Sequence, residues 1–411
     1  IFLFTTLSII LVSKYDKKLD KNYAAEYNAL LLIVLLGMFL MSSSINLIMI
    51  YLSIELVSIP SYILAGMIKS DRESNEASLK YVIFGSFASG LMLFGLSILY
   101  GIVGTTDING INTALQNIDY PLSIYFPLIL IISGFGYKIS MVPFHYWTPD
   151  VYEGAPTPIT AFLSVAPKAA GLAILTRVFY MMFTLDGQLT FGDTLVGINW
   201  PALIAIGSAL TMTLGNILAI QQSDVKRLLA YSSISHVGFM LMAFAIIGPE
   251  SVRAIMMYLF IYLFMNLAAF YMAIFASNKL DAHHIDDWAG LSKMSPLLAG
   301  FMTLTLLSLT GLPPTSGFVG KFYILAELFK HQQFYWLAIV AILNSVISLY
   351  YYFAIVKAMY LVDYQKEIIK LDANPVIKWS IILFSSQNIL FFVYWEPLYN
   401  VIENSIRLWV T

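Results

Sequence analysis

Long apolar segments follow one another along almost the whole chain, and they limit its fold more than any other feature. Each is roughly 20 residues long, which is enough for a helix to cross the roughly 30 Å hydrocarbon core of a bilayer. Only 11% of the residues are charged and 59% are hydrophobic, whereas a soluble domain has about 25% charged residues. The sequence therefore predicts a membrane protein.

Polar breaks divide the apolar sequence into twelve predicted transmembrane segments. In lipid an isolated segment must satisfy its own backbone N–H and C=O groups, so each segment is expected to be a helix. We therefore expect an all-α polytopic membrane protein with about twelve transmembrane helices. The predicted segments are residues 1–13, 27–44, 46–68, 77–103, 122–147, 157–184, 199–221, 226–248, 251–277, 296–330, 333–361 and 376–397.

Positive charges indicate how the segments are oriented. Lys and Arg gather in the connections after odd-numbered segments, for example at Lys14, Lys69, Lys226 and Lys279. The positive-inside rule places these connections in the cytoplasm. The chain begins with Ile1 and carries no basic region typical of a signal peptide, and we expect it to be incomplete at its N-terminus.

The composition also excludes several kinds of chemistry. The sequence contains no cysteine, which excludes disulfides, thiolate metal sites, cysteine nucleophiles and cysteine-ligated iron–sulfur clusters. The net charge of −2 gives no reason to expect a nucleic-acid partner. If the protein serves a redox machine, the electrons travel in other chains.

Two of the predicted segments contain helix-breaking residues. Segment 122–147 has Pro143 near its end, and segment 296–330 has the run GLPPTSG at residues 311–317. Proline removes a backbone hydrogen bond, so the backbone at a break must be covered by protein or face water. The two segments are five apart and cross in opposite directions, which indicates two inverted repeats around a midplane site. The alternative is that one break is only a kink.

This interpretation divides the chain into four parts. An N-terminal segment with its loop (1–26) precedes a first five-helix repeat (27–184), and a second five-helix repeat (199–361) precedes a C-terminal segment and tail (362–411).

We single out four charged residues inside predicted segments and leave Arg177, which is nearer a segment end, to a structural role. Glu55 lies within 46–68, Lys138 before the first break, Lys168 near the centre of the sixth segment and Lys321 just after the second break. A charge at the bilayer centre costs about 2.5–3.5 kcal/mol, so four together predict a functional site. For any single lysine, a packing pair or a side chain that extends to the membrane surface is the alternative.

Buried lysines suit proton transfer, because loss of solvation can lower the pKa of an ammonium from about 10.4 by as much as 3–5 units. A nearby carboxylate acts in the opposite direction and favours the charged form. We therefore interpret Glu55 as a movable counter-ion. When it is close it loads Lys138 with a proton, and when it withdraws Lys138 can release that proton.

Two histidines lie in or beside the same segments. His236 lies near the middle of 226–248 and is either a proton relay or a hydrogen-bonded core residue. His145 follows the Pro143 break, and we expect it to join the same hydrated row.

Two polar stretches need a separate interpretation. The stretch 281–287 has two histidines and three aspartates, but no second cluster completes a metal site, so we interpret it as a solvated loop. In the turn-rich link 148–156, the acids Asp150 and Glu153 either line a proton entrance or cap the following helix.

The chain resembles the antiporter-like subunits of proton-pumping NADH:quinone oxidoreductase, respiratory complex I. The resemblance rests on residues 138–158 (KISMVPFHYWTPDVYEGAPTP), 166–168 (APK), 226–236 (KRLLAYSSISH) and 311–323 (GLPPTSGFVGKFY), and it covers nearly the whole chain. It is closest to the N type, the equivalent of mitochondrial subunit 2. The M type carries a glutamate where Lys321 stands, and the L type continues into a long lateral helix.

The resemblance implies a complete chain of fourteen spans, of which the first two are missing here. It implies that Glu55, Lys138, Lys168 and Lys321 translocate protons laterally through the membrane arm, with His145 and His236 on the same axis. It also implies that this chain holds no cofactor and no redox centre, because NADH, FMN, the iron–sulfur clusters and quinone belong to partner subunits.

The same resemblance implies partners and a location. The partners are the neighbouring antiporter-like and small subunits of the membrane arm, together with the lipid bilayer. The location is a bacterial inner membrane, with an organellar inner membrane as the alternative. Two other functions stay open at this point: a subunit of a multisubunit Na⁺/H⁺ antiporter, which shares the fold and the lysines, and an intramembrane enzyme such as a lipid-linked transferase, which would need the 281–287 loop to be catalytic.

Overall fold

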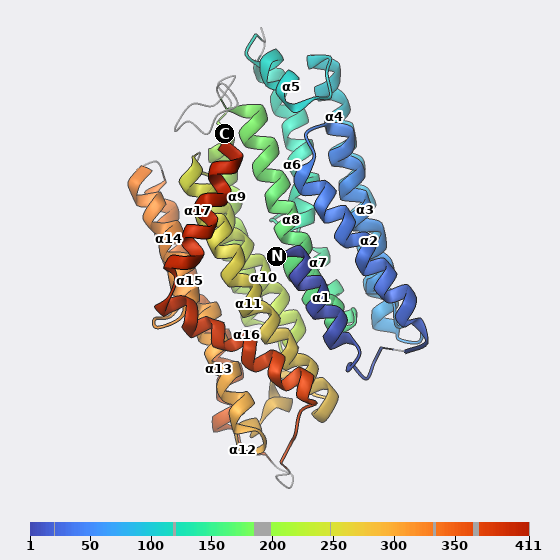
Figure 1. Cartoon of the computed structure of the whole chain (residues 1–411), viewed down its shortest axis with the longest axis vertical. Coiled ribbons are helices and arrows are strands. Elements are labelled where there is room, and N and C mark those ends of the chain that lie inside the picture. Colours follow the sequence, from blue (N-terminus) through green and yellow to red (C-terminus); the bar gives the residue numbers. More distant parts are fainter. Residues whose placement is uncertain are drawn as a thin grey trace.

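The protein is built of helices. Its structure, a computed structural model, describes residues 1–19, 21–117, 121–184, 199–246, 248–331, 334–364 and 370–410. Figure 1 shows the long helices running roughly side by side, with α5 at one end of the molecule and α12 at the other. Within the described ranges nine helices are long and apolar enough to cross a membrane, and α1 and α13 are shorter apolar helices. The prediction of an all-α polytopic membrane protein is confirmed.

The long helices α2, α3, α4, α6, α8, α9, α10, α11, α15 and α16 fall at the places that the apolar pattern predicts. In the first half the helices are α1 (Phe2–Ser13), α2 (Ala24–Ser43), α3 (Leu47–Ala65), α4 (Arg72–Val103), α5 (Ile108–Leu115), α6 (Tyr125–Ile139), α7 (Trp147–Gly154) and α8 (Thr157–Phe183). In the second half they are α9 (Trp200–Ile220), α10 (Val225–Phe244), α11 (Pro249–Leu280), the 3₁₀ turn η5 (Ile285–Trp288), α12 (Leu291–Met294), α13 (Pro296–Thr310), α14 (Ser316–His331), α15 (Tyr335–Leu361), α16 (Pro375–Val393) and α17 (Glu396–Val410).

Both predicted breaks are present. The fifth predicted segment contains α6 and ends where α7 begins, so α7 occupies the stretch that was predicted to be a turn-rich link; the tenth segment divides into α13 and α14. The first half of each broken helix ends on a residue in the left-handed conformation, Ser140 after α6 and Gly311 after α13. In the described part of the chain, neither break is only a kink.

Besides α7 and the one-turn α12, two further helices were not predicted. The short α5 lies in the connection after α4, and α17 lies in what was assigned as a tail. One face of α17 is buried through Leu398, Ile402 and Ile406, which lie four residues apart and therefore share one side of a helix. Such an amphipathic helix is too polar to be recognised from a continuous apolar run.

The core of the molecule lies along α8 and α11. In the most apolar stretch of each, 94% of the residues are buried inside the protein, compared with 28% in α16 and 33% in α15. A helix that is covered on all sides by other helices can carry polar groups away from lipid. The central helices are therefore the natural position for a buried polar row.

Two blocks of five helices have the same order of lengths. α2, α3, α4 and α8 have 20, 19, 32 and 27 residues, and α9, α10, α11 and α15 have 21, 20, 32 and 27 residues. In each block the broken helix precedes the last helix, and its first half has 15 residues. A single antiparallel bridge closes each block, Asn46 with Asp107 in the first and Asp224 with His284 in the second.

We expect Gly215→Val to destabilise the protein, because α9 and α10 approach each other closely at this glycine. A Cβ at Gly215 would lie 2.8 Å from the backbone nitrogen of Ser235 and 3.0 Å from the carbonyl oxygen of Tyr231, and the backbone cannot move aside as a flexible side chain can. The expected loss is about 1–3 kcal/mol, measured by thermal unfolding in detergent. Gly90→Val is the matched control, because a Cβ there has no neighbour within 4 Å. Equal midpoints for the two variants would contradict the close packing of α9 and α10.

Candidate functional site

Lys138 and Glu55 lie on neighbouring helices but do not touch. Lys138 is in the last turn of α6, only 3% exposed, and its ammonium donates a hydrogen bond to Ser58 Oγ on α3 at 2.9 Å. Glu55 lies three residues before Ser58 on α3, where its carboxylate accepts a hydrogen bond from Ser89 of α4. The hydroxyl of Ser58 therefore lies on α3 between the two charged residues, and each has a serine partner.

Lys168 lies near the centre of α8 and is 1% exposed. Its ammonium donates to Ser233 Oγ on α10 at 2.6 Å and lies 5.3 Å from the centre of the Tyr152 ring on α7. Tyr262 of α11 also donates to Ser233, at 2.9 Å. Hydroxyl and aromatic groups thus hold this lysine, and no carboxylate of the described chain is in ion-pair contact with it.

His236 has a hydroxyl partner at each ring nitrogen. Nδ1 lies 2.7 Å from the hydroxyl of Tyr258 on α11, and Nε2 lies 3.2 Å from that of Tyr352 on α15. Tyr352 in turn bonds Ser232 on α10. His236 is therefore a hydrogen-bonded core residue, and the same contacts give a proton two hydroxyl groups through which to arrive and leave.

Lys321 lies in α14, just after the second break, and its side chain reaches back across that break. Its ammonium donates to the carbonyl oxygens of Thr310 at 2.8 Å and Leu309 at 3.4 Å, which belong to the last turn of α13. These carbonyls have no intrahelical partner and carry the negative end of the helix dipole. Ser345 of α15 accepts at 3.3 Å, and the Phe239 ring of α10 lies 4.3 Å away.

Gly311 makes this contact possible. It ends α13 with a φ of +86°, in the left-handed region that favours glycine. A Cβ at this position would lie 2.8 Å from Cδ of Lys321. A larger residue would therefore strain the turn and push the lysine away from the carbonyl groups.

One face of α10 connects the second half of the row. Ser233, His236 and Phe239 lie three residues apart on α10, so they share one side of the helix, and they contact Lys168, two tyrosines and Lys321 in that order. Towards the other end, α8 approaches α6 closely at Gly171, three residues after Lys168. A Cβ there would lie 3.5 Å from Cγ of Lys138. Five of the six predicted site residues therefore lie in a row of helices that pack against one another, from α3 through α6, α8 and α10 to α14. Within the described ranges no hydrogen bond joins Lys138 to Lys168.

His145 is the exception among the predicted residues. It is 4% exposed, and its Nδ1 has no hydrogen-bond partner. Its ring lies beside that of Tyr146, with the centres 4.5 Å apart. The structure does not give it a contact with any of the other five predicted residues in the part of the chain that is described.

Sequence analysis did not single out several groups of the row. The hydroxyl groups of Ser58, Ser89 and Ser233 hold the charged side chains, but serine is too common in helices to be noticed. Glu327 was also missed. It lies on α14 with its side chain 8% exposed and pairs with Lys330 at 2.8 Å. Its position inside the predicted segment 296–330 was a signal that could have identified it.

The two polar stretches have structural roles. Asp287 accepts hydrogen bonds from the backbone N–H groups of His283 and His284 at 3.0 and 2.8 Å, which closes the 281–287 loop on itself. Across the described residues no group of three or more His, Asp or Glu side chains is placed to hold a metal ion.

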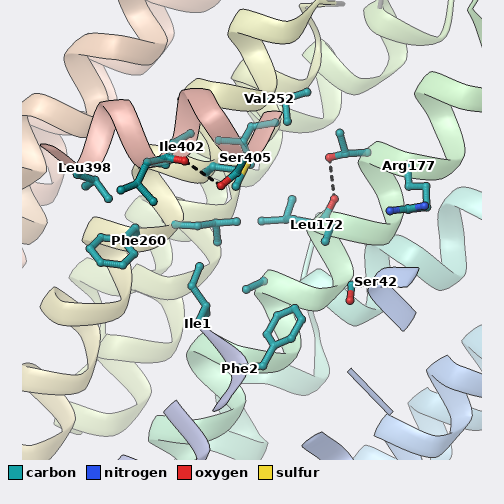
Figure 2. A pocket seen from close by; sticks show the side chains of 17 residues that line it. Ile1, Phe2, Ser42, Leu172, Arg177, Val252, Phe260, Leu398, Ile402 and Ser405 are labelled. Atoms are coloured by element: carbon teal, nitrogen blue, oxygen red, sulfur yellow. Dashed lines mark hydrogen bonds between the residues drawn. The ribbon is translucent and has the colours of Figure 1, made fainter. Parts of the chain in front are cut away.

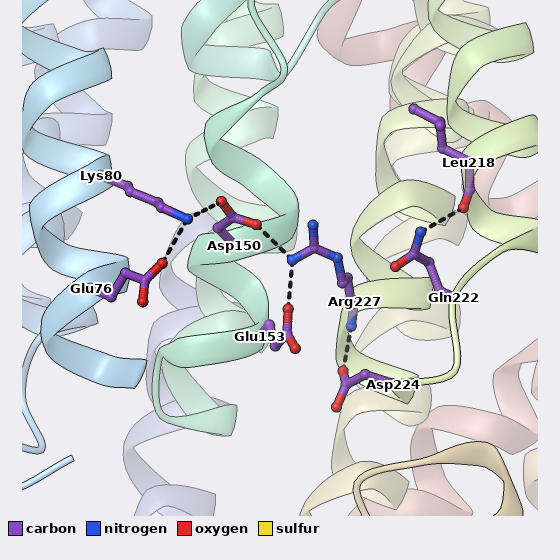
Figure 3. Close-up of polar contacts among 8 residues, drawn as sticks. All are labelled: Glu76, Lys80, Asp150, Glu153, Leu218, Gln222, Asp224 and Arg227. Carbon is purple, nitrogen blue, oxygen red and sulfur yellow. Dashed lines mark hydrogen bonds and ion pairs between the residues drawn. The ribbon is translucent and has the colours of Figure 1, made fainter. Parts of the chain in front are cut away.

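Asp150 and Glu153 do not cap the following helix. α8 begins after Pro156, without a side-chain capping bond. Figure 3 shows that both acids instead take part in a chain of ion pairs between helices. Arg227 of α10 donates to both at 2.6 Å, and Lys80 of α4 donates to Asp150 at 2.6 Å. The second half of the first broken helix is thereby tied to α4 and to α10.

A separate cavity of about 420 Å³ lies between α1, α8, α11 and α17. Figure 2 shows mainly apolar side chains around it, with Arg177 at one side. None of the six predicted site residues lines it. Its mainly apolar lining gives a proton few groups to bind, so we do not assign it to the row.

A family model described as "NADH:quinone oxidoreductase/Mrp antiporter, TM" matches residues 44–348, which include both broken helices and all of the row. The chain belongs to this family. Within the family, it is 40% identical to "NADH-quinone oxidoreductase subunit N" of Anaeromyxobacter sp. (strain Fw109-5), over 99% of this chain and 82% of that relative. It is 44% identical to "NADH-quinone oxidoreductase subunit N 2" of Chloroherpeton thalassium, over 95% of this chain and 76% of that relative.

The family is also represented among solved structures. A chain of respiratory complex I from Thermus thermophilus, determined with bound aureothin, superposes with a TM-score of 0.80 and 27% identity. The match covers 97% of this chain and 84% of that chain. The predicted family resemblance is therefore confirmed, both in sequence and in fold.

We expect the ion pairs of Asp150 to stabilise the protein in a pH-dependent way. Burial acts to raise the pKa of the Asp150 carboxyl, but hydrogen bonds and positive charge from Lys80 and Arg227 outweigh it and hold the pKa below its ordinary value. The stabilisation is then present at neutral pH and lost as the pH falls below about 4. Asp150→Asn should cost about 1 kcal/mol at pH 7 and nothing near the acid end, as measured by thermal unfolding across pH.

Glu76→Gln is the control for this prediction. Glu76 is 54% exposed and pairs only with Lys80, so its removal should change the unfolding midpoint little. A destabilisation by Asp150→Asn that stays constant at low pH would contradict the assigned ion pairs.

Proposed function

We propose that this chain is the proton-translocating N-type subunit of the membrane arm of an NADH:quinone oxidoreductase. Quinone reduction in other subunits shifts the distance between Glu55 and Lys138. Protons then pass along Lys138, Lys168, His236 and Lys321. The observation that carries the proposal is the burial of these four residues on helices that pack against one another, in the core of a protein that belongs to this family.

The contacts of each lysine support a proton carrier more than a structural ion pair. A lysine that only balances charge is expected to face a carboxylate, whereas Lys138, Lys168 and Lys321 are held by hydroxyl and carbonyl oxygens. Such neutral acceptors can bind an ammonium and also leave the amine free to change its protonation. Moving one charge against 100 mV costs about 2.3 kcal/mol. The shift of Glu55 therefore has to change the free energy of a proton bound along the row by at least this amount.

The same proposal assigns the two repeats of the chain, its partner subunits and its membrane. The repeats are residues 27–184 and 199–361, supported by the matching helix lengths in the described ranges; the junction 185–198 lies outside those ranges. NADH, FMN, iron–sulfur clusters and quinone are bound by partner subunits. Neighbouring antiporter-like and small membrane subunits pack against this chain in a bacterial inner membrane. The relatives named above are all subunits N of bacteria, and this favours complex I over a Na⁺/H⁺ antiporter subunit and over an organellar membrane.

We expect Lys138→Ala, Glu55→Gln and Lys321→Ala to reduce quinone-linked proton pumping by about tenfold or more, because each removes a group that binds or controls the moving proton. The measurement is acidification of vesicles that contain the whole reconstituted complex. Lys357→Ala is the matched control, since Lys357 also lies on a long helix but is exposed. NADH oxidation with an artificial acceptor shows whether the redox subunits stay intact. Full pumping by both Lys138→Ala and Glu55→Gln would overturn the assigned roles.

A further inference from the structure

The matching helix lengths allow the two repeats to be compared residue by residue. α3 and α10 each begin after a capping residue, Asn46 and Asp224, whose side chain accepts from the backbone at the helix start. Each capping residue also forms its repeat's antiparallel bridge, with Asp107 and His284 respectively. The two capping residues are therefore equivalent, and positions in α3 and α10 can be counted from them.

This count pairs polar residues of α3 with polar residues at the same positions of α10. The ninth residue after the cap is Glu55 in α3 and Ser233 in α10, and the twelfth is Ser58 in α3 and His236 in α10. The helices that follow agree. In α4 and α11, counted from the residues before them, Ser89 corresponds to Asn266. Ser89 bonds Glu55, and Asn266 donates to Ser164, one turn before Lys168, at 2.6 Å.

We propose that Ser233 is the second repeat's counterpart of Glu55, and that it positions the Lys168 ammonium with a neutral hydroxyl where the first repeat has a carboxylate. Ser233 is then a positioning residue for proton transfer through Lys168. This inference rests on the proposed function, because it needs Lys168 to carry a proton.

The difference between the two positions is one of charge. A carboxylate favours the protonated form of a nearby lysine through its negative charge, whereas a hydroxyl accepts a hydrogen bond without a net charge. Helix α3 of the first repeat therefore has an acid that can hold a proton on Lys138. Helix α10 of the second repeat offers only the Ser233 hydroxyl to Lys168, which lies on α8 of the first repeat. In this assignment Lys168 binds a proton only transiently, whereas Lys138 can keep its proton while Glu55 is close.

The surroundings of Lys168 agree with this assignment. α1 and α5 carry no titratable side chain, and no carboxylate is in hydrogen-bond or ion-pair contact with Lys168 within the described ranges. The titratable side chains of the other helices packed against α8 are Glu26 and Tyr27 on α2, Tyr51, Glu55 and Tyr62 on α3, Tyr125, Tyr137 and Lys138 on α6, Asp150, Tyr152 and Glu153 on α7, Lys226, Arg227, Tyr231 and His236 on α10, and Glu250, Arg253, Tyr258, Tyr262, Tyr271 and Lys279 on α11.

The test introduces a charge at Ser233. Ser233→Asp places a carboxylate beside Lys168, and Ser233→Asn has nearly the same shape without the charge. In the whole complex reconstituted in vesicles, the Asp variant should pump about tenfold less at pH 7, and the alkaline limb of its pH profile should move up by about one unit. The Asn variant can lose part of its rate, but it should keep the wild-type pH profile. Identical pH profiles for the Asp and Asn variants would overturn the inference.

Glu55→Ser is the converse variant, and it decides the question if Ser233→Asp does not assemble. It gives the first repeat the hydroxyl of the second, so the alkaline limb should move to lower pH; an unchanged limb would overturn the inference. Lys168→Met separates the two proposals. If this variant pumps at the full rate, the proposed function of Lys168 fails. If it stops pumping while the Asp and Asn variants share one profile, only the assignment of Ser233 fails.

Discussion

A helix that ends inside a membrane exposes carbonyl groups that neither water nor the helix itself can satisfy, and the arrangement of this protein depends on how it meets that requirement. At the end of α13 the ammonium of Lys321 satisfies two of the free carbonyl groups by donating hydrogen bonds to their oxygen atoms. A broken helix and a buried charge each cost free energy when they stand alone. Here the ammonium supplies hydrogen-bond donors to the free carbonyl groups, and these carbonyl groups supply acceptors to the ammonium. Within the described ranges a buried ammonium is thereby held by carbonyl oxygens, with no carboxylate in ion-pair contact.

The same use of neutral oxygen atoms extends along the row. Ser58 and Ser233 hold Lys138 and Lys168, and the hydroxyl groups of Tyr258 and Tyr352 hold His236. In a medium of low dielectric constant, a fixed carboxylate at each of these positions would bind an ammonium too strongly for it to exchange its proton. Glu55, one helical turn from the serine that holds Lys138, is the acid through which we propose that the charge of the row is controlled.

Sequence reasoning succeeds here where one physical cost dominates. The length of an apolar run determines a transmembrane helix, Pro143 and Gly311 mark the breaks, and the cost of burying charge identifies Lys138, Lys168 and Lys321. It fails where the outcome depends on partners distant in the sequence. Asp150 pairs with Arg227, 77 residues later, so its role as an ion-pair partner could not be separated from capping.

The reach of Lys321 back to α13 and the isolation of His145 depend on side-chain directions that no pattern encodes. The amphipathic helix α17 was missed because its buried face is recognised only when the surface that it covers is known. Serine partners such as Ser233 become visible only after the two repeats are compared in space.

The ion pairs of Arg227 have a mechanical consequence. α7 belongs to the first block of helices and α10 to the second, and Arg227 joins them through two carboxylates, while Lys80 joins α7 to α4. Lys226 adds a bond to the carbonyl oxygen of Ala155, at the end of α7. Rocking one block against the other, as many transporters do to open alternate sides, would break this latch at the membrane face. A mechanism that leaves these ion pairs intact has to move protons by rearranging side chains rather than by moving whole helices.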